Sequence, residues 1–473
     1  MSKKYNKKIA HFIGIGGIGM SSLAQWFLAE NWAISGSDMA DSGFIRELRK
    51  LGLYVKIGHK KANIRPKTSL VVYNQAISDT NPEILEARRK GIQTLSYPEV
   101  LGGLTRRYRT VAIAGAHGKS TSTALAALVL IKVGFDPTVI IGTRLREFRS
   151  KIARGNNFRN GRSDWLIAEA DEWKAAFLNY RPYAALITNV DREHLDYYKN
   201  FVNIKKTFLR FIMNIRRGGI LVVNRDNPGL WSLRSSIALI AKKNNLRVFW
   251  YHAPTSYDER GVFMKIKKSL QIPGQHNFSN AVGVYNLCRM FGIQEKYILA
   301  AFRKYHGAWR RLEYRGKFKI RSVNGKYAID VYDDYAHHPT EIKATLQGLR
   351  ERYPFHKIIC VFQPHQAERL RLLFKEFIRA FDEADNLILL PIYRVVGRDK
   401  MDHHFTSKRL SKDINKMNKK KNIDSITSYL PYPSRLPIFL RNLITKPMLG
   451  FENSVIVMMG AGDIVKLTDS LLE

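Results

Sequence analysis

The strongest chemical signal in this chain is a phosphate-binding pattern at residues 115–121, with the spacing G-x-x-G-K-S-T. It is two residues shorter than the common phosphate loop. Its glycines would let the backbone approach a phosphate closely. Its lysine would reach the β- and γ-phosphates of a nucleotide, and one of its hydroxyls would ligate Mg²⁺. The residues concerned are Gly115, His117, Gly118, Lys119, Ser120 and Thr121.

The elements expected around this loop are those that such chemistry needs. The apolar run 111–114 predicts a buried parallel strand, and residues 123–130 predict a helix. The first N–H groups of a helix have no internal partner, and the helix dipole favours negative charge there. A phosphate would therefore be stabilised at this turn. The alternative is an ordinary strand-to-helix turn with a solvated lysine.

A second glycine-rich turn lies between an expected strand at 9–13 and an expected helix at 20–30. It has the spacing G-x-G-x-x-G, and Asp38 follows about 20 residues later, after the next expected strand at 33–36. This arrangement predicts Rossmann-type binding of a nucleotide diphosphate, with Asp38 on a ribose or base edge. It does not distinguish NAD from other nucleotides, and Asp38 is alternatively a turn residue. The four glycines are Gly14, Gly16, Gly17 and Gly19.

Acidic residues and a histidine follow two further apolar runs. Residues 165–172 end in Glu169, Asp171 and Glu172, and residues 184–196 contain His194 near their end. The carboxyl ends of parallel strands meet at one edge of a sheet, where ligands bind. Glu169 and His194 are therefore expected to hold Mg²⁺ beside the phosphate loop; the alternative for His194 is a structural role. Downstream, Asn277 is expected either to cap a helix at 281–290 or to contact a nucleobase.

The last third of the chain predicts another α/β layer with a parallel core. Residues 317–323 and 326–332 alternate around Asn324-Gly325, which predicts a hairpin. The segment 333–339 then lies between a strand and a helix, with Pro339 near the helix start. Arg310 and Arg311 precede this layer, where a guanidinium would reach phosphate when domains close.

Composition limits the possible classes of protein. A chain of 473 residues predicts two to four domains, and two cysteines exclude a disulfide framework. No apolar run approaches the roughly 20 residues that span a bilayer, and the basic N-terminus lacks the apolar core of a signal peptide; we therefore expect a cytoplasmic protein. The net charge of +38 is spread along the chain, and the densest lysine cluster, at 412–421, is expected to be a solvated loop. A basic surface that attracts anionic substrates is favoured over nucleic-acid binding, because no base-stacking motif or DNA-binding element is evident.

These motifs, taken together and in order, resemble those of the Mur ligases. The matching pieces cover nearly the whole chain: GIGGIGM at 14–20, GAHGKST at 115–121, EADE at 169–172, NVDREHLD at 189–196, PGQHNFSN at 273–280, GAWRR at 307–311, DDYAHHP at 333–339, QPH at 363–365 and GAGDI at 460–464. The chain is most similar to the branch of the family that adds alanine. Trp173-Lys174 departs from it, because Ser-Asp is usual after EADE.

The resemblance implies three α/β domains: a Rossmann-like UDP-binding domain at 1–106, a central ATP-binding domain at 107–308 and a C-terminal Rossmann-like domain at 309–473. A linker is expected at Gly102-Gly103 and Arg106-Arg107. The implied activity is ATP-dependent addition of L-alanine to the carboxylate of UDP-N-acetylmuramate in peptidoglycan synthesis, with ATP and Mg²⁺ bound and no nucleic-acid or membrane partner. A monomer or homodimer is expected. Alternatives are a recycling ligase that adds a tripeptide to the same sugar nucleotide and, from the first glycine turn, an NAD-dependent oxidoreductase.

The resemblance also implies roles for single residues. The catalytic residues would be Lys119, His194, Arg311 and His337. The ATP contacts would be the loop 115–121 with His276, Asn277, Asn280 and Arg310. Mg²⁺ would be held by Ser120, Glu169 and His194. The other substrates would lie against the first glycine turn, Ser37, Asp38, Asp333, Tyr335 and His337.

Overall fold

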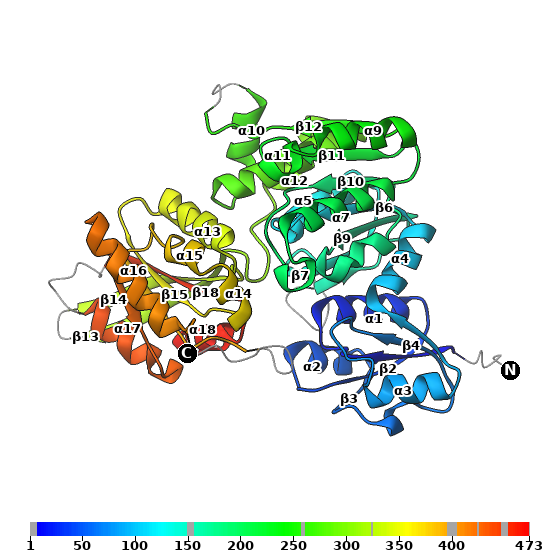
Figure 1. Cartoon of the computed structure of the whole chain (residues 1–473), viewed down its shortest axis with the longest axis horizontal. Helices are drawn as coiled ribbons and strands as arrows, with labels where there is room; N and C mark the ends of the chain where they lie inside the picture. Colours follow the sequence, from blue (N-terminus) through cyan, green and yellow to red (C-terminus); the bar gives the residue numbers. More distant parts are fainter. Residues whose placement is uncertain are drawn as a thin grey trace. The chain divides into compact units, whose positions relative to one another are not determined.

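The computed structural model describes residues 7–148, 156–256, 261–322, 325–394, 404–422, 425–445 and 453–472. It contains three separate sheets with helices packed against them, which confirms the α/β class (Figure 1). The chain divides into two compact units, one formed by Met1–Gln271 with Ser279–His306 and the other by Ile272–Phe278 with Gly307–Glu473. The first unit holds two of the sheets, and the second unit holds the third.

The first sheet has five parallel strands in the order β3-β2-β1-β4-β5. This order reverses direction at β1 and β4, so the glycine turn after β1 lies at the switch point where open α/β sheets bind ligands. The strands are β1 Ile9–Ile13, β2 Ala33–Asp38, β3 Tyr54–Ile57, β4 Thr68–Tyr73 and β5 Gln93–Ser96. The helices are α1 Ile18–Ala29, α2 Gly43–Lys50, η1 Lys61–Asn63, α3 Pro82–Arg89 and α4 Tyr97–Arg107.

Helix α4 replaces the linker that the sequence predicted at Gly102-Gly103 and Arg106-Arg107. The side chain of Glu99 accepts hydrogen bonds from the Ser96 N–H at 2.7 Å and the Ser96 hydroxyl at 2.6 Å, which starts the helix in a capping box. A Cβ on Gly102 would lie 2.7 Å from the backbone oxygen of Asn179. The glycine therefore permits close packing between α4 and the segment at Asn179, and the linker prediction was wrong.

The second sheet has seven strands in the order β12-β11-β10-β6-β9-β7-β8, parallel except for the β7–β8 pair. Buried aliphatic residues fill its central strands, as expected for a parallel sheet covered on both faces. The strands are β6 Arg109–Ala114, β7 Thr138–Leu145, β8 Asn156–Arg159, β9 Trp165–Ala170, β10 Ala184–Ile187, β11 Ile220–Asn224 and β12 Arg247–Tyr251. The helices are α5 Lys119–Lys132, η2 Trp173–Asn179, α6 Leu195–Tyr198, α7 Phe201–Met213, α8 Pro228–Trp231, α9 Arg234–Asn244, α10 Val262–Ser269, α11 Gln275–Met290 and α12 Glu295–Phe302.

The third sheet has six strands in the order β13-β14-β18-β15-β16-β17, all parallel except β13 with β14. Strands β13 Glu313–Ser322 and β14 Gly325–Asp334 form the predicted hairpin, although Asn324 at its turn lies outside the described residues. The other strands are β15 Lys357–Phe362, β16 Asn386–Leu389, β17 Ile426–Tyr429 and β18 Ser454–Met459. The helices are α13 Pro339–Arg352, α14 Ala367–Leu372, α15 Phe374–Ile378, α16 Ser407–Lys421, η3 Pro433–Arg435, α17 Leu436–Ile444 and α18 Ile464–Leu472.

The lysine cluster at 412–421 lies on helix α16 and not in a loop. The side chain of Thr406 caps the helix start, and Leu410 and Ile414, one turn apart, are buried. The lysines lie on the solvated face of the helix. Their number made the segment look like a loop in the sequence, although its apolar residues pack the helix against the sheet.

Two further predictions concern the whole chain. Cys288 and Cys360 are both buried and free, as expected for a chain without a disulfide framework. Within the part of the chain that the structure describes, no helix combines the length and apolar character needed to cross a membrane.

Candidate active site

The phosphate loop has the strand–turn–helix geometry that the sequence predicted. Strand β6 ends at Ala114 and helix α5 begins at Lys119, with Gly118 in the left-handed conformation at φ +81°. A Cβ on Gly118 would overlap the side-chain amide of Asn280, and a Cβ on Gly115 would overlap the hydroxyl of Thr188. Both glycines are therefore required by close neighbours, and the N–H groups of the first turn of α5 stay open to a ligand.

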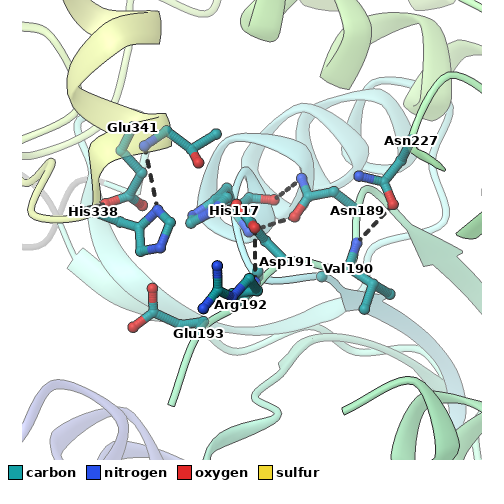
Figure 2. Close-up of polar contacts among 12 residues, drawn as sticks. His117, Asn189, Val190, Asp191, Arg192, Glu193, Asn227, His338 and Glu341 are labelled. Atoms are coloured by element: carbon teal, nitrogen blue, oxygen red, sulfur yellow. Dashed lines mark hydrogen bonds and ion pairs between the residues drawn. The ribbon is translucent and has the colours of Figure 1, made fainter. Parts of the chain in front are cut away.

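The segment after β10 holds this loop in place. The backbone N–H of His117 donates to Oδ1 of Asn189 at 2.8 Å, and Nδ2 of Asn189 donates to the carbonyl oxygen of His117 at 3.0 Å. The His117 ring lies 3.0 Å from the carboxylate of Asp191, as measured between Nε2 and Oδ2. Figure 2 shows the Asn189 amide facing His117 across these two bonds. The role that the structure gives to Asn189 and Asp191 is to position the loop.

Lys119 forms a buried ion pair with Glu172. Its Nζ lies 2.8 Å from Oε2 of Glu172 and also donates to the backbone oxygen of Gly115 at 2.6 Å. The side chain of Lys119 is 16% exposed and that of Glu172 is 2% exposed. Burial opposes both charges, but for each group the attraction of the oppositely charged partner outweighs the effect of burial. The pKa of Lys119 is therefore raised, and that of Glu172 is lowered. Both side chains are thus held in their charged forms.

The second oxygen of Glu172 faces His194. Oε1 lies 3.6 Å from Nε2 of His194, beyond hydrogen-bond distance, and it is buried without a hydrogen-bond partner among the described residues. Burial lowers the pKa of His194, and the carboxylates of Glu172 and Glu193 outweigh this effect and raise it. Donor atoms of Asp171, Glu172 and His194 all lie within 4.8 Å of one another. This is a set of oxygen and nitrogen donors that a divalent cation would accept.

Glu172 is a candidate site residue that the sequence analysis did not single out. The prediction paired Glu169 with His194, but Oε1 of Glu169 accepts the backbone N–H of Gly142 at 2.7 Å, and Glu169 is not part of the group of donor atoms around His194. Lys174 and Ala175 have left-handed backbone angles in the segment that follows Glu172. The run of acids is visible in the sequence. The alternation of side chains along a strand ends with β9 at Ala170, so it does not predict which acid after the strand faces the phosphate loop.

The first glycine turn is also organised as predicted, with one difference. Gly14 has φ +76°, and no side chain caps α1, so the N-terminal N–H groups of this helix are open to a diphosphate. The carboxylate of Asp38 accepts the backbone N–H of Gly16 at 2.8 Å. In this structure Asp38 therefore accepts a hydrogen bond from a backbone N–H of the glycine turn itself. Its predicted contact with a ribose or base edge stays a prediction.

Ser37 belongs to a buried polar network that the sequence did not reveal. Its hydroxyl donates to the carboxylate of Glu83 at 2.5 Å and lies 3.0 Å from Nδ1 of His59. Glu83 is fully buried, and Oε2 also lies 3.4 Å from Nε2 of His11. Burial opposes the charge of Glu83, but the hydrogen bonds of the two histidines, Ser37 and Asn63 outweigh it and lower its pKa. The network joins β1, β2 and α3 directly behind the glycine turn.

Helix α11 begins five residues before Asn280, and this changes the expected role of Asn277. The helix starts at Gln275, so Asn277 lies inside its first turn, and its side-chain amide donates to the backbone oxygen of Pro273 at 2.6 Å. It is not the helix cap that the sequence suggested. Asn280 lies against Gly118 in the phosphate loop. The predicted adenine contacts of His276, Asn277 and Asn280 stay predictions.

In the second unit, the predicted residues gather around the end of β14. Arg310 is buried, and its guanidinium donates to the backbone oxygens of Gly460 and Gly462, the latter at 3.3 Å. Burial lowers the pKa of Arg310. Its contact with ATP stays a prediction, and the present contacts favour a structural role. The guanidinium of Arg311 is partly exposed and lies 3.7 Å from Oε1 of Glu341.

The two histidines of this segment have different environments. Nδ1 of His337 lies 3.0 Å from the backbone oxygen of Tyr335 and 3.3 Å from Oε2 of Glu341. His338 caps helix α13, with Nδ1 accepting the backbone N–H of Thr340 at 3.3 Å (Figure 2). The structure thus gives His338 a local structural role, while His337 remains the candidate for catalysis.

Asp333 and Asp334 are both buried and hydrogen-bonded within this unit. Asp333 accepts from the hydroxyl of Thr468 at 2.5 Å and pairs with Arg315. Asp334 accepts the backbone N–H groups of Leu312 at 2.6 Å and Ala336 at 2.7 Å. Burial raises the pKa of Asp334 to about 6. The two carboxylates fix the backbone that presents Tyr335 and His337.

Comparison with known proteins finds family matches along most of the chain. Three family models match: "Mur ligase family, catalytic domain" at 9–109, "Mur ligase middle domain" at 113–288 and "Mur ligase, glutamate ligase domain" at 310–434. The UDP-N-acetylmuramate–L-alanine ligase of Clostridium botulinum (strain Okra / Type B1) is 36% identical, covering 98% of this chain and 97% of its own. That of Aquifex aeolicus is 37% identical, covering 81% and 83%. Among solved structures, the UDP-N-acetylmuramate-alanine ligase of Thermotoga maritima superimposes with a TM-score of 0.73 at 24% identity, covering 98% of each chain, and so shares the fold.

Proposed function

The chain belongs to the Mur ligase family, and from this premise we propose that it joins L-alanine to the carboxylate of UDP-N-acetylmuramate, with conversion of ATP to ADP and phosphate. The observation that carries the proposal is the 36% identity, over nearly both full lengths, to a relative that bears this activity in its name. The product is a peptidoglycan precursor.

The reaction has two steps, and the residues of this chain position and screen charge in both. The substrate carboxylate attacks the γ-phosphorus of ATP, ADP leaves, and an acyl phosphate forms. The amine of L-alanine then attacks the acyl carbon and expels phosphate. In the first step two anions must approach each other, so Lys119 and the open N–H groups of α5 have to neutralise the phosphates. The ion pair with Glu172 keeps Lys119 charged and in place before the nucleotide arrives.

Mg²⁺ fits the residues beside Lys119. The unpartnered buried oxygen of Glu172 and the adjacent atoms of His194 and Asp171 provide a suitable donor set, and Ser120 and Glu169 are the further ligands that the sequence predicts. When bound, the ion would neutralise charge on the phosphates. The charge and geometry of Glu172 are what would recruit it.

The glycine turn of the first sheet would hold the diphosphate of the sugar nucleotide. Phosphate oxygens would accept hydrogen bonds from the N–H groups at the start of α1. The N–H of Gly16, which now donates to Asp38, would donate to the phosphate instead. Ser37 lies on β2 beside this turn, and its hydroxyl is held by the hydrogen bond to Glu83. The network behind the turn would keep its backbone fixed while the ligand is exchanged.

The second unit would contribute the contacts for alanine and the transferred phosphate. Arg311 is the partly exposed cation of the 310–311 pair, Asp333 lies near the end of β14, and Tyr335 and His337 lie on the segment that follows it. His337 would orient the amine, and Arg311 would reach phosphate.

The remaining parts of the proposal concern the molecule as a whole. The proposed domains are 1–106, 107–308 and 309–473, each built on one of the three sheets. We propose a cytoplasmic monomer or homodimer that has no nucleic-acid partner.

The test is phosphate release from ATP in the presence of UDP-N-acetylmuramate, with and without L-alanine. Release that requires both, with a product heavier by one alanyl unit, is expected. Release with a tripeptide and not with alanine would assign the chain to the recycling branch. Absence of release with either amine donor, together with tight NAD binding, would overturn the ligase proposal.

A further inference from the structure

We propose that Lys174, which belongs to the second sheet's domain, binds the diphosphate of the sugar nucleotide held by the first sheet's glycine turn. The inference rests on the proposed function and assigns a further binding residue to it. Lys174 follows strand β9 on segment η2, and its side chain is exposed. No basic residue occurs in the glycine turn itself, residues 14–19, so any cation that contacts the diphosphate comes from elsewhere in the chain.

Lys174 already lies against the loop that lines this turn. Its Nζ donates to the backbone oxygen of Gln75 at 3.2 Å, and Nε2 of Gln75 donates to the backbone oxygen of Lys174 at 3.3 Å. The residue before Gln75 is Asn74, which packs against the glycine turn: a Cβ added to Gly14 would lie 3.1 Å from Cβ of Asn74, and one added to Gly17 would lie 3.0 Å from its Nδ2. The ammonium group is therefore hydrogen-bonded to a residue that borders the proposed diphosphate site.

The backbone around Lys174 is held in an unfavourable conformation. Lys174 has φ +49° and Ala175 has φ +58°, and neither is a glycine. Such angles cost about 1–2 kcal/mol for each L-residue and persist where neighbours enforce them. Here the N–H of Ala175 donates to the oxygen of Glu172 at 2.8 Å, and the hydroxyl of Tyr198 donates to the same oxygen. This turn directs Glu172 to Lys119 and, two residues later, Lys174 to Gln75, so one short segment connects the two phosphate sites.

The present partner of Lys174 is one that a phosphate would replace. Gln75 offers a neutral carbonyl oxygen, whereas a phosphate oxygen offers a charge-assisted hydrogen bond, which is roughly twice as strong. We infer that Lys174 moves from Gln75 to the diphosphate when the sugar nucleotide binds.

The test measures binding of UDP to the full chain by calorimetry in the absence of ATP, so that it does not depend on turnover. Lys174→Met is expected to weaken UDP binding about tenfold and to leave ADP binding unchanged. Lys174→Gly is expected to weaken UDP binding equally while keeping or raising stability, because glycine adopts φ +49° without strain. Lys174→Arg is expected to restore most of the affinity. The matched control is Lys132→Met, an exposed lysine about 20 Å along α5 from Lys119, which is expected to leave both affinities unchanged.

Unchanged UDP affinity in both Lys174→Met and Lys174→Gly would overturn the inference. Weakened binding of UDP-N-acetylmuramate with unchanged binding of UDP would also overturn it, because the contact would then be to the sugar carboxylate. Both results leave the ligase activity of the natural chain untouched. Conversely, a chain that binds UDP through Lys174 but forms no alanyl product would contradict the proposed function alone.

Discussion

Glu172 connects Lys119 of the candidate phosphate loop with His194. One of its oxygens holds Lys119 at 2.8 Å, and the other is buried and turned toward His194. A carboxylate so placed would repel the phosphates of a nucleotide unless a divalent cation accompanies them. This arrangement predicts that nucleotide binding and Mg²⁺ binding are coupled through this single side chain.

We expect Glu172→Gln to change both stability and the metal dependence of binding. The free energy of unfolding should fall by about 2 kcal/mol, less than for a fully buried pair because Lys119 is 16% exposed. ADP without metal should bind more tightly than to the natural chain, because the repelling charge is gone, and the gain in affinity on adding Mg²⁺ should shrink. Calorimetry with EDTA or with Mg²⁺ measures this. Asp171→Asn, which neutralises an exposed neighbour, is the control for stability; an unchanged metal dependence in Glu172→Gln would contradict the assignment.

Gly118 provides a second prediction for a single residue. Gly118→Ala should lower the free energy of unfolding and weaken ADP binding at least tenfold, because alanine at φ +81° is strained and its methyl group would displace Asn280. Gly134→Ala is a matched control, since Gly134 has φ +83° and open space around it. It should show the strain of about 1 kcal/mol and no loss of ADP affinity. Equal losses of affinity in the two variants would exclude Asn280 as the cause.

At the scale of elements, the first sheet is held together behind its ligand turn by one buried carboxylate. Glu83 on α3 contacts His11 on β1 and Ser37 on β2, and its Oε1 accepts from Asn63 at 2.5 Å. These three groups, together with His59 and the backbone N–H of Lys60, satisfy a charge that would otherwise be expensive to bury. The glycine turn lies directly after β1, so the network fixes the turn through the strands that it joins.

Glu83→Gln is expected to lower the free energy of unfolding by about 3 kcal/mol at pH 7. The folded protein lowers the pKa of Glu83 below its ordinary value of 4.5, so this stability is present above pH 4.5 and is lost as the pH falls below it. The difference between the natural chain and the variant should therefore narrow below pH 4.5, as measured by denaturant unfolding from pH 3 to 7. Glu86→Gln on the same helix, whose carboxylate pairs with Arg89 and Lys90, should have a small effect. A difference that stays constant across this range would contradict the assignment.

At the scale of the whole molecule, charge is the dominant feature. A net charge of +38 on 473 residues surrounds the protein with a positive potential, and the proposed substrates ATP and UDP-N-acetylmuramate are anions. The potential would raise the rate at which these substrates are captured, and salt would screen it.

We therefore expect kcat/KM for UDP-N-acetylmuramate to fall about tenfold between 0.05 and 0.5 M salt. The KM for L-alanine, which has no net charge, serves as the control and should change little. Steady-state kinetics at several salt concentrations measure both values. Equal salt sensitivity for the two substrates would show that salt acts on the enzyme and not on the capture of anions.

The parts of the structure that the sequence predicted correctly are those governed by neighbours along the chain. The glycine turn after β1 and the loop before α5 follow from local backbone rules, because a strand, a turn with positive φ and a helix start are encoded within about ten residues. The hairpin of β13 with β14 follows for the same reason.

Two local predictions were wrong where tertiary packing outweighed composition. The glycines of α4 suggested a linker, but Gly102 packs against Asn179, which lies far away in the sequence. The lysines of α16 suggested a loop, but Leu410 and Ile414 bury one face of a helix. In α4 the deciding contact is absent from the local sequence, whereas in α16 the two apolar residues are local and only the packed structure shows that they are buried.

The sequence by itself determined that two glycine-rich turns join a strand to a helix, which residues form them, and that acids and a histidine lie at nearby strand ends. Only the tertiary structure decided that Glu172 and not Glu169 faces Lys119 and His194, and that Glu83 lies behind the first turn between His11 and His59. The physical reason is that turns depend on backbone angles of consecutive residues, whereas partners of a buried charge are chosen in space, by whichever side chains folding brings within hydrogen-bond distance.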